Sequence, residues 1–358
     1  MVHIVLFLAF FLTLLARGKY KYLQYIAFAL LFVFAAIRYM YGNDYKNYMT
    51  MFDMVHRGVS LNDGEPLFEL LCKVMPSFYV LIAVTSGFFV FTIYRLITKN
   101  LPTNYVWIGM FLFVYNTNLF VLNLSSIRQC IAMCVFLHAV NMAYKRKPLH
   151  YVLLVVIAAM FHKILWTMLP LYFFLTDKPV KNWQVIVILL GVATVVALAD
   201  LQSLAQNVLS VFNDKNYMHY SNLGLHNSLR ATILTTLFFF YILFNLRCLE
   251  GKMLVYGKLY LLSTVLGLFA YRMTMFGRLQ MLFEIVSVVV LPVIMLKTRE
   301  RGPIIINYKN VLLTVWECVN KFVLPWLLLV IIVLRYYSFF IAEIWEPFFH
   351  YDTIFSLL

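Results

Sequence analysis

Residues Ser77 to Ile97 read SFYVLIAVTSGFFVFTIYRLI, and the only charged residue among these 21 is Arg95, close to the end of the stretch. As an α-helix rising 1.5 Å per residue, the stretch covers the roughly 30 Å hydrocarbon core of a bilayer. Similar stretches recur along the chain, which is 63% hydrophobic and 12% charged. Soluble domains carry about a quarter charged residues, so a soluble fold is excluded. The sequence predicts an all-α, polytopic transmembrane helical bundle that forms one domain over residues 1–358.

We predict about twelve membrane spans, with ten as the lower count. They are Val2 to Ala16, Tyr20 to Ile37, Ser77 to Ile97, Thr103 to Val121, Ile127 to Tyr144, His150 to Met160, Ile164 to Thr176, Trp183 to Ala199, Arg230 to Leu246, Leu254 to Tyr271, Leu279 to Leu296 and Phe322 to Ile341. The sixth and seventh are too short to cross untilted, so His150 to Thr176 forms either two tilted spans or, instead, a pair of half-helices or a re-entrant hairpin. The longest segments between spans are residues 38–76 and 200–229.

The distribution of charge predicts an orientation. One set of alternate loops carries 18 of the 29 Lys and Arg residues, so we assign it to the cytoplasmic side. The opposite, outer face carries most of the acids. Because the basic residues are spread between spans, the net charge of +14 does not indicate nucleic-acid binding. The five cysteines form no CxxC pair, so neither disulfides nor a metal site is predicted.

The first outer loop has the pattern of a short amphipathic helix on the membrane surface. Its aromatic residues recur at helical spacing, Asn43 or Asp44 can cap the helix, and Gly58 can end it. Pro66 suits the first position of a second helix, with Glu65 as its cap and the Glu65 carboxylate near the surface. Alternatively, the aromatic residues form only an interfacial belt and the acids only cap helices. The aromatic residues at helical spacing in this loop are Tyr41, Tyr45, Tyr48 and Phe52.

Three further outer turns carry candidate site residues. Ser126 and Gln129 form a capping box before the fifth span, which places Arg128 beside free helix N–H groups, an arrangement typical of a phosphate site. Snorkelling of Arg128 to the interface is the alternative interpretation. His162 can act as a general base or donate to phosphate, and no second metal ligand stands at ligand spacing. Arg272 and Arg278 form a second cationic edge.

An ordered set of motifs in these outer turns resembles a known family. The set comprises Arg38, Gly42-x-Asp44-Tyr45 with Tyr48, Glu65-Pro66-x-Phe68, Arg128-Gln129-x-x-Ala132 and Phe161-His162. It resembles the EpsG branch of the Wzy-type polymerases, which make O-antigen, capsule and exopolysaccharide. The first half of the chain carries most of the resemblance, while the second half matches through Arg272, Arg278 and the number of spans.

The resemblance implies a metal-independent membrane glycosyltransferase of GT-C-like architecture that needs no cofactor. Such an enzyme joins oligosaccharide repeat units carried on undecaprenyl diphosphate, at the outer face of a bacterial plasma membrane. Besides this substrate and membrane lipid, the implied partners are a chain-length regulator and a flippase, and nucleic acid is not among them. The sugar composition, the linkage, the stereochemical course and the oligomeric state cannot be predicted from the sequence.

The candidate residues can be given roles in that reaction. Arg128, with Arg272 or Arg278, is predicted to bind the diphosphate and stabilise its growing charge. Asp44, Glu65 or His162 removes the proton of the acceptor, and we favour a carboxylate for this step. The remaining predicted substrate contacts are Arg38, Tyr45, Tyr48 and Gln129. The alternatives are a flippase or transporter of the same lipid-linked glycan, a related glycosyltransferase or O-antigen ligase, and a structural subunit that binds lipid headgroups.

Overall fold

The computed structural model describes residues 1–16, 20–61, 63–181, 184, 229–270, 275–300 and 311–357. The chain divides into two compact units. Unit 1 contains Met1–Thr176, Leu291–Val293 and Leu329–Leu358, and unit 2 contains Asp177–Val290 and Ile294–Leu328. The predicted single domain stays a prediction. Apart from Leu229, the predicted outer loop 200–229 lies outside the described residues.

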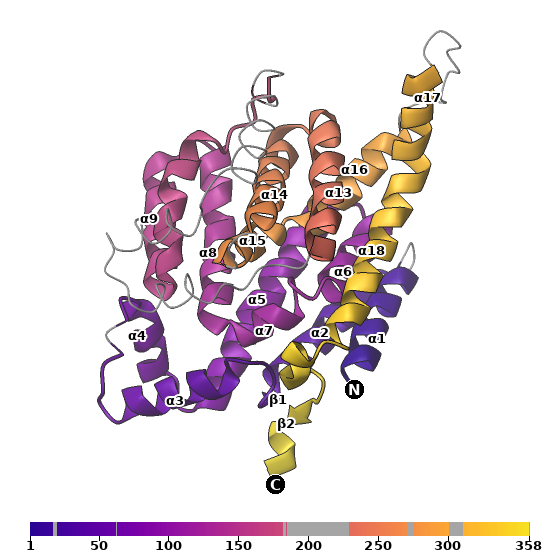
Figure 1. Cartoon of the computed structure of the whole chain (residues 1–358). Coiled ribbons are helices and arrows are strands. Elements are labelled where there is room, and N and C mark those ends of the chain that lie inside the picture. The colour runs from indigo at the N-terminus through magenta and orange to yellow at the C-terminus, as the bar shows by residue number, and fades with distance from the viewer. Residues whose placement is uncertain are drawn as a thin grey trace. The chain divides into compact units, whose positions relative to one another are not determined.

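Unit 1 carries the first of the two predicted outer loops, whose helices α3 and α4 lie near one end of α8 and α9 (Figure 1). Its α-helices are α1 (Val2–Leu15), α2 (Leu23–Ala36), α3 (Tyr45–His56), α4 (Pro66–Val74), α5 (Phe78–Asn100), α6 (Val106–Tyr115), α7 (Val121–Ser125), α8 (Ile127–Tyr144) and α9 (Pro148–Phe161). Its 3-10 helices are η2 (Thr103–Tyr105), η3 (Lys163–Phe173), η7 (Glu343–Phe348) and η8 (Ile354–Leu357). Strands β1 (Arg38–Tyr39) and β2 (Asp352–Thr353) complete it.

Unit 2 contains the apolar helices of the second half of the chain. They are α13 (Leu229–Asn245), η4 (Leu246–Cys248), α14 (Gly251–Phe269), α15 (Met275–Glu284), most of α16 (Ser287–Glu300), α17 (Val311–Cys318), the π-helical turn η6 (Val319–Val323) and the start of α18 (Leu324–Phe339). The π turn carries Asn320, whose side-chain amide exchanges two hydrogen bonds of 2.9 and 2.8 Å with that of Asn245. This buried pair joins α13 to the helix that continues into α18.

The described residues contain five helices that are long and apolar enough to cross a membrane, or six if the bent pair α15 and α16 forms one span. The predicted count of about twelve is not confirmed. Helices α1, α2 and α9 have 14 residues each, which is about 21 Å at 1.5 Å per residue. The predicted fourth span is interrupted between α6 and α7, and the predicted eighth, apart from Gln184, lies outside the described residues. The chain is nevertheless an all-α, multi-span membrane protein in these regions.

The predicted amphipathic helix of the first outer loop is confirmed as α3. Tyr45, Tyr48 and Phe52 are buried on one face, packed on Phe68 of α4 and Phe78 of α5. Gly58 follows the helix with φ +80°, as predicted for its end. Asp44 occupies the N-cap position, although its side chain makes no capping hydrogen bond. The aromatic stripe is therefore the core of this end of unit 1 and not an interfacial belt.

Two features of unit 1 were not predicted. The chain end returns to the first outer loop, because β2 pairs antiparallel with β1 and Gly42 N–H donates to the Pro347 carbonyl at 3.1 Å. The predicted seventh span is the 3-10 helix η3, in which Pro170 lies inside the helix. Helix α9 ends at Phe161 and His162 has extended backbone angles, so the chain turns back between α9 and η3. The predicted turn at Phe161–Lys163 is confirmed.

Candidate functional site

The Glu65 carboxylate is buried where α4 meets the turn after α9. Glu65 is the N-cap residue of α4, as predicted, but its side chain makes no cap bond and is only 2% exposed. Glutamate is a poor N-cap residue because its side chain is long. Here the side chain instead turns inward, and Oε1 accepts hydrogen bonds from His162 Nδ1 at 2.8 Å and from Lys163 N–H at 3.1 Å. The carboxylate is therefore buried beneath the surface and not exposed on it.

Arg128, in the first turn of α8, contacts the other oxygen of this carboxylate. Its NH1 nitrogen lies 2.6 Å from Glu65 Oε2, and the same nitrogen is hydrogen-bonded to Asp63. The guanidinium also lies over the rings of Tyr48 and Phe68, at 5.6 and 5.5 Å from their centroids. A cation in the first turn opposes the helix dipole, and these two carboxylates offset that cost. Arg128 is thus occupied by acids in this state and is not an open anion site.

The charges of this cluster keep Glu65 ionised. Burial alone would raise the pKa of Glu65, but the hydrogen bond and charge of His162 and the positive charge of Arg128 outweigh burial and lower it. A carboxylate with a lowered pKa has little tendency to take a proton. Oε1 also already accepts two hydrogen bonds, and Oε2 is ion-paired with Arg128. Of the two carboxylates that the sequence offered as the base, Glu65 is therefore poorly suited to that role, and the role of Asp44 stays a prediction.

The same hydrogen bond determines what His162 can do. An ionised carboxylate can only accept hydrogen bonds, so the hydrogen between Glu65 and His162 is carried by Nδ1. In a neutral imidazole the other nitrogen, Nε2, then carries a lone pair. A ring held in one tautomer by a buried carboxylate is the arrangement by which many enzymes hold a histidine base. The His162 side chain is 12% exposed, so the dyad lies just below the surface.

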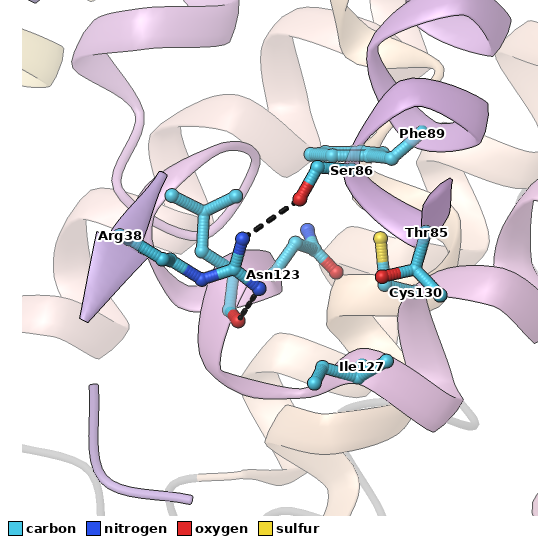
Figure 2. A pocket seen from close by; sticks show the side chains of 8 residues that line it. Arg38, Thr85, Ser86, Phe89, Asn123, Ile127 and Cys130 are labelled. Carbon is cyan, nitrogen blue, oxygen red and sulfur yellow. Dashed lines mark hydrogen bonds between the residues drawn. The ribbon is translucent and has the colours of Figure 1, made fainter. Parts of the chain in front are cut away.

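Arg38, predicted to bind substrate, lies in a separate polar pocket (Figure 2). It is 2% exposed and donates to the carbonyls of Ala35 and Leu124 and, at 2.7 Å, to the Ser86 hydroxyl. Burial lowers the pKa of Arg38 to about 10, which leaves it charged at neutral pH. Arg38 thus ties α2 to α5 and to the corner between α7 and α8.

The lining of this pocket suits a water better than a phosphate. Arg38 Nε and Asn123 Oδ1 are buried and have no hydrogen-bond partner among the described residues. The hydroxyl hydrogens of Ser86 and Thr85 are already donated to carbonyls, and the Asn123 amide nitrogen is bonded to the Asn118 and Leu119 carbonyls. One donor and several acceptors therefore face a cavity of about 10 Å³, roughly the room one water needs. A diphosphate site at Arg38 is not supported.

The other predicted site residues have different locations. Tyr45 is 2% exposed and its hydroxyl donates to the Arg38 carbonyl at 3.2 Å, so it is a core residue. Gln129 is also buried. Ser126 is the N-cap of α8, but its side chain makes no cap bond, so the predicted capping box was wrong. The Asp44 backbone N–H donates to the Ser125 hydroxyl at 3.0 Å, which places Asp44 at the corner before α8.

The structure does not test the predicted second cationic edge. Arg278 belongs to unit 2, and Arg272 lies outside the described residues. Their predicted contact with a diphosphate stays a prediction. In the described part of the chain, no group of three or more His, Cys, Asp or Glu side chains could hold a metal ion. Metal independence likewise stays a prediction.

Sequence reasoning missed Asp63 as a member of this cluster. Its Oδ1 accepts the Glu65 N–H at 3.1 Å and its Oδ2 bonds Arg128. The signal was present in the sequence, since an Asp before Gly commonly accepts a hydrogen bond from the backbone two residues on. Ser86 and Asn123 were also missed, because each lies in an apolar helical stretch and its role depends on Arg38 from a distant segment.

The fold and the site define a multi-span membrane protein with a carboxylate, a histidine and an arginine gathered at one end of unit 1. A family model described as EpsG family matches residues 21–353, and the chain belongs to this family. The family resemblance predicted from the sequence is confirmed, and the chain is a polysaccharide polymerase-like membrane protein. No curated protein matches the chain, and no solved structure does.

Proposed function

We propose that this protein polymerises a polysaccharide by joining oligosaccharide repeat units carried on undecaprenyl diphosphate, at the outer face of a bacterial plasma membrane. The observation that carries the proposal is the 2.8 Å hydrogen bond between His162 Nδ1 and the buried Glu65 carboxylate. It supplies a base for a sugar hydroxyl next to a guanidinium suited to a phosphate. Membership of the EpsG family supports the same reaction class.

In the proposed reaction, His162 Nε2 takes the proton from a hydroxyl at the non-reducing end of the acceptor unit. The acceptor oxygen bonds the anomeric carbon of the growing glycan, and the bond from that carbon to the donor diphosphate breaks. Undecaprenyl diphosphate leaves with the electron pair. Glu65 positions the imidazole and stabilises the imidazolium that forms, because its charge lies at hydrogen-bond distance from Nδ1. Arg128 stabilises the charge that grows on the diphosphate.

The first test is polymerisation by the purified protein. The protein is incubated in detergent with its lipid-linked repeat unit, without nucleotide sugar or added metal, and the glycan is analysed on a gel. A ladder of multiples of the repeat unit is expected. Positioned general bases contribute roughly 10²- to 10⁴-fold, so His162→Gln should slow the reaction by about that factor.

A matched histidine controls for the substitution itself. His56→Gln changes an exposed histidine of α3 in the same end of unit 1 and should leave the ladder unchanged. A wild-type protein that is monodisperse yet leaves the repeat unit unchanged would contradict polymerisation. If it moved the repeat unit across vesicles, the proposal would give way to transport. Transfer to a different acceptor would favour a ligase.

A further inference from the structure

The proposed function leaves a conflict at Arg128. Its NH1 nitrogen is hydrogen-bonded to Asp63 and ion-paired with Glu65, so two negative charges already exceed its single positive charge. With a neutral His162 the four side chains carry a net charge of −1. An arriving diphosphate would be repelled by this arrangement unless one carboxylate left Arg128. The structure indicates which one can leave.

The two carboxylates are held very differently. Glu65 is 2% exposed and is also bonded to His162 and to the Lys163 backbone, so moving it would break three interactions. Asp63 is 23% exposed, and its only other described contact is with the nearby Glu65 N–H. Gly64 beside it has φ +78° and open space around its Cα. Because water reaches the Asp63 carboxylate and this side chain makes fewer contacts, its ion pair with Arg128 costs less to break than that of Glu65.

We propose that Asp63 is a built-in competitor of the substrate, which neutralises Arg128 in the empty enzyme and is displaced by the diphosphate of the lipid-linked donor. The proposal rests on the proposed function and assigns a specificity role to a residue outside the reacting dyad. Exchange of one anion for another at Arg128 leaves the Glu65–His162 hydrogen bond intact. A ligand with no charge or a single negative charge would not displace Asp63. The Asp63 carboxylate therefore favours ligands with the charge of a diphosphate.

Asp63→Asn is the sharpest test variant. The Asn carbonyl can still accept the Glu65 N–H, which preserves the turn before α4. The amide nitrogen then faces Arg128, so the charge pair is lost and the guanidinium is released. Asp53→Asn is the matched control, because Asp53 is an exposed acid of α3 and the change in net charge is the same.

Binding is measured directly, with undecaprenyl diphosphate in detergent micelles and with inorganic pyrophosphate as separate probes. If Asp63 competes, Asp63→Asn should bind undecaprenyl diphosphate roughly three- to tenfold more tightly than wild type, whereas Asp53→Asn should bind as wild type does. The KM for the lipid-linked unit should fall while kcat changes less than twofold. If pyrophosphate also binds more tightly, the diphosphate alone is enough to displace Asp63. If only undecaprenyl diphosphate gains affinity, the lipid must hold the diphosphate at Arg128 for Asp63 to be displaced.

Equal or weaker binding by Asp63→Asn would overturn the proposal, because Asp63 would then position Arg128 and not compete for it. So would a gain of the same size in Asp53→Asn, which would reflect net charge alone. These outcomes do not depend on catalysis. Failure of the proposed function would instead appear as the absence of a ladder from wild-type protein, whatever the binding results.

Discussion

Replacing Glu65 by Gln separates a carboxylate that acts through His162 from one that is itself the base. Gln keeps the shape of the side chain, and its carbonyl oxygen can still accept from His162 and Lys163. Both hydrogen bonds change from charge-assisted to neutral, and each change lowers the free energy of unfolding by roughly 1 kcal/mol. The Gln amide also faces Arg128, which retains Asp63. Loss of the ion pair between residue 65 and Arg128 lowers the free energy of unfolding further, by about 1–2 kcal/mol. The total loss is then roughly 3–4 kcal/mol, within the 3–5 kcal/mol typical of broken buried pairs.

The rate measurement uses a double-mutant cycle of Glu65→Gln and His162→Gln in the polymerisation assay. If Glu65 acts by stabilising the imidazolium, Glu65→Gln should slow the wild-type enzyme by about 10²-fold and should have little further effect when His162 is already Gln. Thermal unfolding in detergent checks that each variant is folded at the assay temperature. The same slowing by Glu65→Gln in both backgrounds would refute the dyad, because the carboxylate would then act without His162.

Three further predictions test other parts of the structure. Gly42→Ala should destabilise more than Gly58→Ala: both have positive φ, which costs about 1–2 kcal/mol, but only at Gly42 would a Cβ lie 2.9 Å from another atom. Thermal midpoints measure the difference. Replacing the side chains of Asn245 and Asn320 singly and together in a double-mutant cycle should show a coupling energy of about 1 kcal/mol between them in unfolding measurements. Because the folded-state pKa of Glu65 is lowered, its contribution to stability is present above the unfolded pKa of about 4.3 and is lost as pH falls through the folded pKa, so Glu65→Gln should flatten the decline in thermal midpoint below about pH 4.

Local elements of the loop over residues 38–76 could be predicted because their signals are short-range. The aromatic spacing predicted the buried face of α3, and Gly58 and Pro66 marked where one helix ends and the next begins. The short apolar stretches around His162 predicted a turn there. In each case the relevant residues lie within a few positions of one another, so the periodicity and the turn residues carry the information.

The partners within the site could not be predicted in the same way. Glu65 and His162 are 97 positions apart, and Arg128 and Asp63 are 65 apart. Their meeting depends on how α4 packs against α8 and α9, which no local pattern specifies. From the sequence we predicted that the Glu65 side chain caps α4, because Glu65 holds the N-cap position. In the structure the side chain instead turns toward His162 and Arg128. The predicted number of spans is not confirmed, because several of the apolar stretches that were counted form short or broken helices in the described residues.

The arrangement of charges explains how one site can serve both a base and an anion. In the empty enzyme, the two negative charges of Asp63 and Glu65 exceed the single positive charge of Arg128. If the diphosphate replaces Asp63, the negative charge beside Arg128 is kept, so the imidazolium formed during proton transfer still faces a compensating environment. The glycosidic oxygen then leaves on a diphosphate that contacts a guanidinium. The proposal therefore needs a partly exposed acid that can leave Arg128 and a buried acid that stays. Asp63 and Glu65 differ in burial in this way.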